Sequence, residues 1–107
     1  MQATVFGGSG FLGSHVCDLL SENGYKVIVF DKKKSSWIKK KQQMFIGDIN
    51  NKIDVKKAIS GSKIIYNFAG LADIEDCKKK PIDTIQQNIL GNANIIEQSI
   101  KQKVKRY

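Results

Sequence analysis

The chain has 107 residues, of which 41% are hydrophobic and only one is proline, so we expect one small folded domain and no long disordered linker. No apolar stretch approaches the ~20 residues of a membrane-spanning helix, and the chain begins with an apolar run instead of a signal peptide, so we expect a cytoplasmic protein without a membrane partner. Cys17 and Cys77 lie far apart and lack metal-ligand spacing, which predicts reduced thiols and no metal site.

The net charge of +8 raises the possibility of nucleic-acid binding, because basic proteins attract phosphate backbones. All but one of the basic residues are lysine, whereas the readout of base edges favours arginine. The lysine clusters at 32–34, 39–41 and 78–80 fall in expected loops. We therefore expect no nucleic-acid partner, and keep a basic nucleic-acid-binding protein only as an alternative.

Residues 3–6 predict a short buried strand, and a glycine-rich turn follows it directly. Gly8, Gly10 and Gly13 match one spacing of the dinucleotide-binding fingerprint, and Gly7, Gly10 and Gly13 match the other. In such turns one glycine allows a sharp bend, one lets a pyrophosphate approach the backbone, and one lets the helix pack close to the strand. Free N–H groups and the helix dipole then favour a phosphate at the helix N-terminus.

The helix that follows ends at Asn23 and Gly24, where the apolar periodicity stops. A second apolar run, 25–30, leads to Asp31, close to the ~20-residue interval at which a carboxylate accepts the ribose hydroxyls of a bound dinucleotide. This strand–turn–helix–strand–acid order predicts a dinucleotide site far more strongly than glycine spacing alone.

Two further strands are predicted, at 44–46 and 63–66. Between them we expect a helix capped by Asn50 or Asn51. The run at 63–66 is almost continuously apolar, as is typical of strands buried on both faces of a parallel sheet.

A long helix is predicted at 84–102, capped by Asp83 or Thr84. Gly91 lies in its middle and suggests a close approach between helix and sheet. The apolar residues of this helix recur at steps of three and four, at Ile85, Ile89, Ala93, Ile96 and Ile100.

The alternation of strands and helices predicts an α/β fold, a Rossmann-type parallel sheet with strand order 3-2-1-4 and helices on both faces. We expect this sheet to be incomplete. Ligands of such sheets bind outside the carboxyl ends of the strands where the strand order reverses, here between the first and fourth strands. The glycine turn, Asp31, 47–48 and 67–71 all fall at predicted carboxyl ends.

With these elements in order, the sequence resembles the N-terminal part of the extended short-chain dehydrogenase/reductase family, the NAD-dependent nucleotide-sugar epimerases and dehydratases. The resemblance covers almost the whole chain, and its last two stretches look most like a UDP-sugar 4-epimerase. It rests on Gly7 to His15, Asp31, Gly47 to Ile49, Asn67 to Leu71, Asn88 to Gly91 and Asn94 to Glu97.

The resemblance implies a role for each matching position. Phe11 and Leu12 would give backbone N–H groups to the pyrophosphate, and Asp31 would hold the adenosine ribose. Asp48 and Ile49 would bracket the adenine, with the carboxylate accepting from its exocyclic amine. The full set of implied cofactor-binding residues is Gly7, Gly10, Phe11, Leu12, Gly13, Asp31, Lys32, Asp48, Ile49, Phe68, Ala69, Gly70 and Leu71.

Residues 68–71 would line the path toward the nicotinamide ribose. Asp31 favours NAD as the cofactor, because a carboxylate repels the 2′-phosphate of NADP, but Lys32 and Lys33 keep NADP possible. The chain also departs from the family pattern, with Asn67 where many members have His and Asn92 where a Thr usually follows the glycine.

The catalytic Tyr-x-x-x-Lys pair of the family has no match here. Tyr25 and Tyr66 lack a lysine four residues on, and Tyr107 is the last residue. We therefore expect 1–107 to be the N-terminal part of an NAD(P)-binding Rossmann domain, without the catalytic and substrate-binding regions. The parent would act on a nucleotide sugar by transient hydride transfer to NAD, as a possible homodimer through 84–102. A stand-alone, non-catalytic nucleotide-binding module is the alternative.

Overall fold

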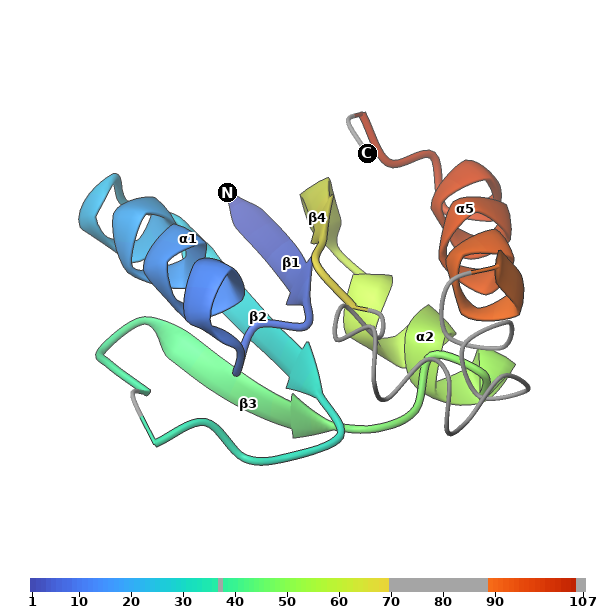
Figure 1. The fold of residues 1–107 in the computed structure, drawn as a ribbon. Coiled ribbons are helices and arrows are strands. Elements are labelled where there is room, and N and C mark those ends of the chain that lie inside the picture. Colours follow the sequence, from blue (N-terminus) through green and yellow to red (C-terminus); the bar gives the residue numbers. More distant parts are fainter. Residues whose placement is uncertain (37, 70–88, 106–107) are drawn as a thin grey trace.

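The computed structural model describes residues 1–36, 38–69 and 89–105 (Figure 1). Within them, strands and helices alternate along most of the chain. The elements are β1 (Gln2–Phe6), α1 (Phe11–Glu22), β2 (Lys26–Asp31), β3 (Gln42–Ile46), α2 (Lys52–Ile59), β4 (Ser62–Asn67) and α5 (Gly91–Lys101). Each predicted strand and helix is therefore present in the described residues, with ends that differ by a few residues. Positions 84–88 of the predicted long helix lie outside the described residues.

All four strands run parallel in the order β3-β2-β1-β4, which confirms the predicted Rossmann-type sheet. Phe6 at the end of β1 pairs with Phe30 of β2 on one side and with Asn67 of β4 on the other. The carboxyl ends of these three strands therefore meet at one edge of the sheet, where the strand order reverses.

Helices cover both faces of the sheet, as expected: α1 lies on one side, and α2 and α5 on the other (Figure 1). Successive strand residues point to opposite faces, so Val5 packs in the α1 layer while Phe6 packs in the α2 and α5 layer. The Phe6 and Phe30 rings lie 4.8 Å apart. These two rings, from the last residue of β1 and the last but one of β2, therefore pack next to the carboxyl edge of the sheet.

Cys17 lies in the α1 layer and is almost fully buried, as a small apolar filler. It is a free thiol. Burial in this apolar layer, helped by the negative charge of Asp18, raises the pKa of the Cys17 thiol to about 12. The group is therefore neutral and unreactive at neutral pH. Cys77 lies outside the described residues.

The prediction that 63–66 is buried on both faces was wrong. Ile64 is only partly buried and Tyr66 is 37% exposed. β4 is the last strand of the described sheet, so one of its two edges has no paired strand among the described residues. The backbone N–H of Lys105 donates to the Lys63 carbonyl at 3.2 Å, so the described chain returns to this strand after α5.

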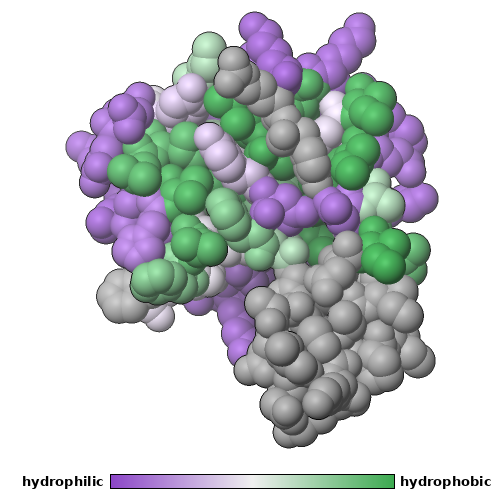
Figure 2. All heavy atoms as spheres, turned by 45° about the horizontal axis from the view of Figure 1, so that its top comes forward, coloured by the Kyte–Doolittle hydropathy of each residue, from purple (hydrophilic) through white to green (hydrophobic). Residues whose placement is uncertain are grey.

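The apolar stripe predicted for the last helix lies on the outer side of α5. Ile89, just before the helix, is 61% exposed, and within it Ile96 and Ile100 are 41% and 73% exposed. Ile95 is instead buried against the sheet layer, and Gly91 is buried as well. Hydrophobic side chains accordingly reach the surface among hydrophilic ones (Figure 2). Helical periodicity marked an apolar stripe correctly but could not show which stripe faces the sheet.

In the ranges 1–36, 38–69 and 89–105, no helix combines the length and the hydropathy that crossing a bilayer requires.

Asn51, and not Asn50, caps α2, which decides between the two predicted caps. Its side-chain oxygen accepts hydrogen bonds from the N–H groups of Ile53 and Asp54, at 3.0 and 3.1 Å. Replacing Asn51 by Ala should therefore lower the free energy of unfolding by ~1 kcal/mol. Asn50→Ala is the matched control and should have a much smaller effect in the same chemical denaturation experiment. Equal losses from the two variants would contradict this assignment.

Candidate functional site

The glycine turn bends at Gly7, whose φ of +75° lies in the left-handed region that glycine adopts without strain. The N–H groups of Gly7 and Gly8 both donate to the carbonyl of Phe30, at 2.8 and 3.2 Å. Gly10 then serves as the N-cap of α1. Gly8 has no room for a side chain either, because a Cβ there would stand 2.7 Å from Cγ1 of Val29. The turn therefore uses glycines of both spacings that the sequence left open.

Gly13 and Gly10 differ in what surrounds them. A Cβ on Gly13 would stand 2.2 Å from the Gly7 carbonyl oxygen, so only glycine lets α1 start so close to β1. Among the described residues, a Cβ on Gly10 would meet nothing nearer than that same oxygen at 3.4 Å. Packing within the described part of the chain therefore explains Gly13 but not Gly10, and Gly10 lines a cleft where α1 begins.

The first turn of α1, which starts after Gly10, carries backbone donors without helical partners. The N–H groups of the first helical residues, Phe11, Leu12 and Gly13, have no acceptor within the helix. Gly10 has no side chain with which to cap them. The Phe11 and Leu12 side chains are 79% and 63% exposed, so they do not bury this end of the helix in the core. The arrangement suits an anion.

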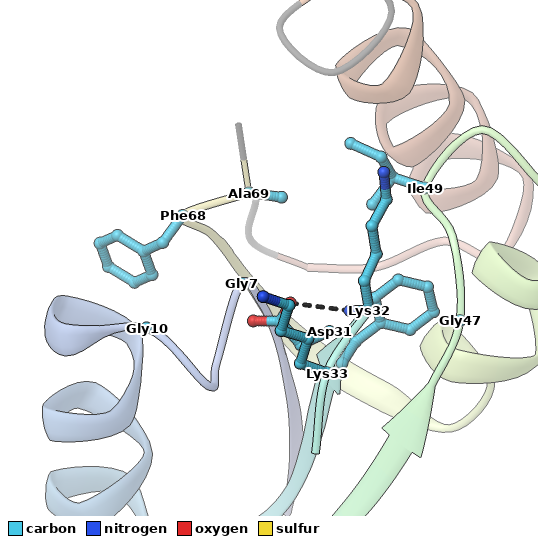
Figure 3. Close-up of a pocket in the computed structure, with 10 residues that line it drawn as sticks. Gly7, Gly10, Asp31, Lys32, Lys33, Gly47, Ile49, Phe68 and Ala69 are labelled. Atoms are coloured by element: carbon cyan, nitrogen blue, oxygen red, sulfur yellow. Dashed lines mark hydrogen bonds between the residues drawn. The ribbon is translucent and has the colours of Figure 1, made fainter. Parts of the chain in front are cut away.

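Asp31 points toward the glycine turn. One carboxylate oxygen accepts from the N–H of Ser9 at 3.1 Å, and the other accepts from the N–H of Lys32 at 2.7 Å (Figure 3). The Ser9 hydroxyl donates to the carbonyl of Lys33 at 2.8 Å. The two hydrogen bonds from Ser9 thus join the glycine turn to the end of β2, and the bonds from Ser9 and Lys32 hold the Asp31 carboxylate at the carboxyl edge.

A cleft of about 290 Å³ opens between these elements. Phe68 and Ile49 lie on either side of it, with Asp31 at the end of β2 between them (Figure 3). The cleft brings together residues that follow all four strands of the described sheet. Its described lining residues are Gly7, Gly10, Phe30, Asp31, Lys32, Lys33, Gly47, Ile49, Phe68 and Ala69.

Most of the predicted cofactor residues therefore meet at one place. Sequence reasoning did not count Phe30, Lys33 or Gly47 among the cofactor residues. Each is a direct neighbour of a residue that it did count, so position at a strand end could have identified all three. Gly70 and Leu71 lie outside the described residues.

Four predicted residues do not line this cleft: Phe11, Leu12, Gly13 and Asp48. A contact between the backbone N–H groups of the first three and a pyrophosphate stays a prediction, and Phe11 lines a separate cavity beside α1. Asp48 shapes the turn into α2, because its carboxylate accepts from the N–H of Asn50 at 2.9 Å. A contact between Asp48 and an adenine stays a prediction.

The described lining of the cleft carries groups that suit the binding of a ligand. Its titratable lining residues, among those described, are Asp31, Lys32 and Lys33. The described ranges also contain no group of three or more His, Cys, Asp or Glu side chains that could hold a metal ion. Apolar walls, a fixed carboxylate and free helix-end amides would recognise a ligand that carries a flat apolar group, hydroxyls and phosphate.

Comparison with known proteins agrees with this geometry. The model of a family described as "NAD dependent epimerase/dehydratase family" matches residues 3–107. The UDP-glucose 4-epimerase of Yersinia enterocolitica is 30% identical, over 99% of this chain and 35% of its own length. The sterol-4-alpha-carboxylate 3-dehydrogenase (decarboxylating) of Mus musculus is 34% identical, over 90% of this chain and 25% of its own length.

A solved structure shows the same fold. The Thermus thermophilus UDP-glucose 4-epimerase, in complex with NAD, superposes with a TM-score of 0.89 at 28% identity, over 97% of this chain and 35% of that protein. The chain thus spans about a third, or less, of the length of these three proteins.

The packing around Gly13 predicts that Gly13→Ala destabilises the protein, although helix propensity alone predicts the opposite. Propensity alone would make Gly13→Ala stabilising by ~1 kcal/mol. Because the new methyl group would overlap the Gly7 carbonyl, we expect a loss of ~1–3 kcal/mol or more in the free energy of unfolding. Gly10→Ala, whose methyl group fits, should change that free energy by less than ~1 kcal/mol. Chemical denaturation of the two variants measures the difference, and a stabilised Gly13→Ala would refute the close approach.

Proposed function

Because the chain belongs to the NAD dependent epimerase/dehydratase family, we propose that its cleft binds the adenosine and pyrophosphate half of NAD. The observation that carries this proposal is the convergence of two features at one edge of the sheet. Gly7 and Gly10, which lead into the first turn of α1, line the same cleft in which Asp31 holds its carboxylate toward the glycine turn. Gly10 supports the placement of the pyrophosphate, because it lines the cleft and packing among the described residues leaves room there for a methyl group.

In this proposal each part of the ligand meets the chemistry that suits it. The pyrophosphate accepts hydrogen bonds from the N–H groups of Phe11 and Leu12, where the α1 dipole also favours negative charge. The ribose hydroxyls donate to Asp31, and the adenine lies against Ile49. Phe68 flanks the way toward the nicotinamide, the group that would supply hydride chemistry when NAD is bound.

For the protein as a whole we propose a nucleotide-sugar epimerase or dehydratase that works by transient hydride transfer to NAD. The name of the Yersinia relative and the NAD complex of the Thermus structure support this reading. The mouse relative, a sterol dehydrogenase, shares the same region of sequence, so the substrate itself is the least constrained part of the proposal. The chain would supply the cofactor-binding N-terminal part, since it lacks the Tyr-x-x-x-Lys pair.

We also propose that the protein forms a homodimer through α5. The support is the family resemblance together with the exposed stripe of Ile89, Ile96 and Ile100, which would be covered in a dimer.

Isothermal titration with NAD tests the binding proposal. The 107-residue chain should bind NAD saturably, with Kd below ~1 mM. Gly10→Ala should weaken binding by about tenfold or more while the protein stays folded, because its methyl group occupies the space meant for the pyrophosphate. The proposal fails if the folded chain shows no NAD binding, or if Gly10→Ala binds as tightly as the original protein.

Asp31 should set both affinity and cofactor preference. Asp31→Asn removes the charged acceptor of the ribose hydroxyls, so NAD affinity should fall by about tenfold to a hundredfold. NADP should lose less affinity than NAD, because the repulsion of its 2′-phosphate disappears and Lys32 and Lys33 remain. Parallel titrations with the two cofactors measure the ratio.

Asp18→Asn is the matched control, since it removes the same charge from α1 outside the cleft. The side-chain hydrogen bond from Gln42, followed by the contact with Lys39, holds the pKa of Asp18 below its ordinary value. This control should therefore lose a little stability but no NAD affinity. An unchanged NAD-to-NADP ratio in Asp31→Asn would contradict the assigned role of Asp31.

A further inference from the structure

α5 contributes none of the described lining residues of the cleft, yet it bonds to both of its walls. The side chain of Asn92 accepts a hydrogen bond from the Asn67 side chain, from Nδ2 to Oδ1, at 2.9 Å. Two residues further on, the Nδ2 group of Asn94 donates to the backbone carbonyl of Ile49, also at 2.9 Å. One turn of one helix therefore holds the end of β4 and the loop after β3.

The backbone groups near these side chains determine whether each asparagine amide offers its oxygen or its NH₂ group to its partner. Oδ1 of Asn67 accepts from the N–H of Ala69 at 3.0 Å, so its NH₂ group faces Asn92. Asn92 must then offer its oxygen. Asn94 faces a carbonyl and must offer its NH₂ group. Asn92 therefore acts as a hydrogen-bond acceptor, whereas Asn94, two residues further on, acts as a donor.

These two bonds reach opposite sides of the cleft. Asn67 is the last residue of β4, and the chain continues from it into Phe68 and Ala69, which line one side. Ile49 lines the other side (Figure 3). The attachment of α5 to the core is separate, because it rests on Ile95, which is fully buried in the layer beneath the sheet.

We infer that Asn92 and Asn94 are positioning residues that hold the two walls of the cleft at the separation in which NAD binds. This inference rests on the proposed function. Neither side chain touches the ligand space, so each acts through the residue that it holds. The cleft would widen or shift when either bond is lost, while α5 stays packed through Ile95.

The same substitution at the two positions separates this role from a general structural one. Asn94→Asp has no donor for the Ile49 carbonyl and sets a negative charge against it, so NAD affinity should fall by about tenfold. Asn92→Asp keeps an acceptor oxygen for Asn67 and should lose far less. Asn92→Leu, which cannot accept, should weaken binding by about fivefold to tenfold. At position 92, Asp should therefore retain most of the NAD affinity that Leu loses.

Titration with NAD and thermal melting are measured on each variant of the 107-residue chain. Glu97→Gln, on the exposed side of the same helix, is the control and should bind NAD as the original protein does. The inference is supported when Asn94→Asp and Asn92→Leu lose affinity while their melting temperatures stay within a few degrees of the original.

Four results would overturn it. If Asn94→Asp and Asn92→Leu bind NAD normally, the proposed function stands and only the positioning role falls. If both aspartate variants lose affinity equally, or if affinity falls only together with the folded state, the role is merely structural. Failure of the original chain to bind NAD removes the proposed function first, and this inference with it.

Discussion

The close approach of α1 to β1 at Gly13 and Gly7 is the constraint on which the site depends. Without a side chain at Gly13, the helix can begin almost in contact with the strand end, and its first N–H groups face the carboxyl edge of the sheet. A side chain at position 13 would push the start of α1 away from the end of β1 and so move these N–H groups away from the carboxyl edge. The proposed anion binding therefore depends on a single close backbone contact.

The carboxylate of Asp31 is held by backbone N–H groups at the end of β2 and in the glycine turn. Each carboxylate oxygen accepts one of these hydrogen bonds, which leaves further lone pairs for a ligand. Holding an acceptor in place before the ligand arrives reduces the ordering cost of binding. Ser9 lies in the glycine turn between β1 and α1, and its hydroxyl adds a further bond to this arrangement by donating to the carbonyl of Lys33 in the loop after β2.

Sequence reasoning succeeded where local chemistry decides the outcome. The glycine spacing, the acid after the second strand and the alternation of elements led to the parallel sheet and to most residues of the cleft.

Sequence reasoning failed where packing against another element decides which side chains are buried. The stripe of Ile89, Ile96 and Ile100 has perfect helical spacing but lies outside, because Ile95 faces the sheet instead. β4 looks fully buried by composition, yet its place at the end of the described sheet exposes Tyr66. Asn67 and Asn92 were noted as two separate departures from the family pattern, and they prove to bond to each other.

The sequence by itself determined the kind of site, since only glycine permits the bend at Gly7 and the contact at Gly13, and only an acid offers charged acceptors at the end of β2. These properties belong to single residues and their backbone, so they can be recognised before folding is known. The tertiary structure alone decided how the walls of the cleft are held. The bonds from Asn92 and Asn94 join segments 25 and 45 residues apart, and no local pattern encodes a contact that exists only once the sheet and α5 have packed together.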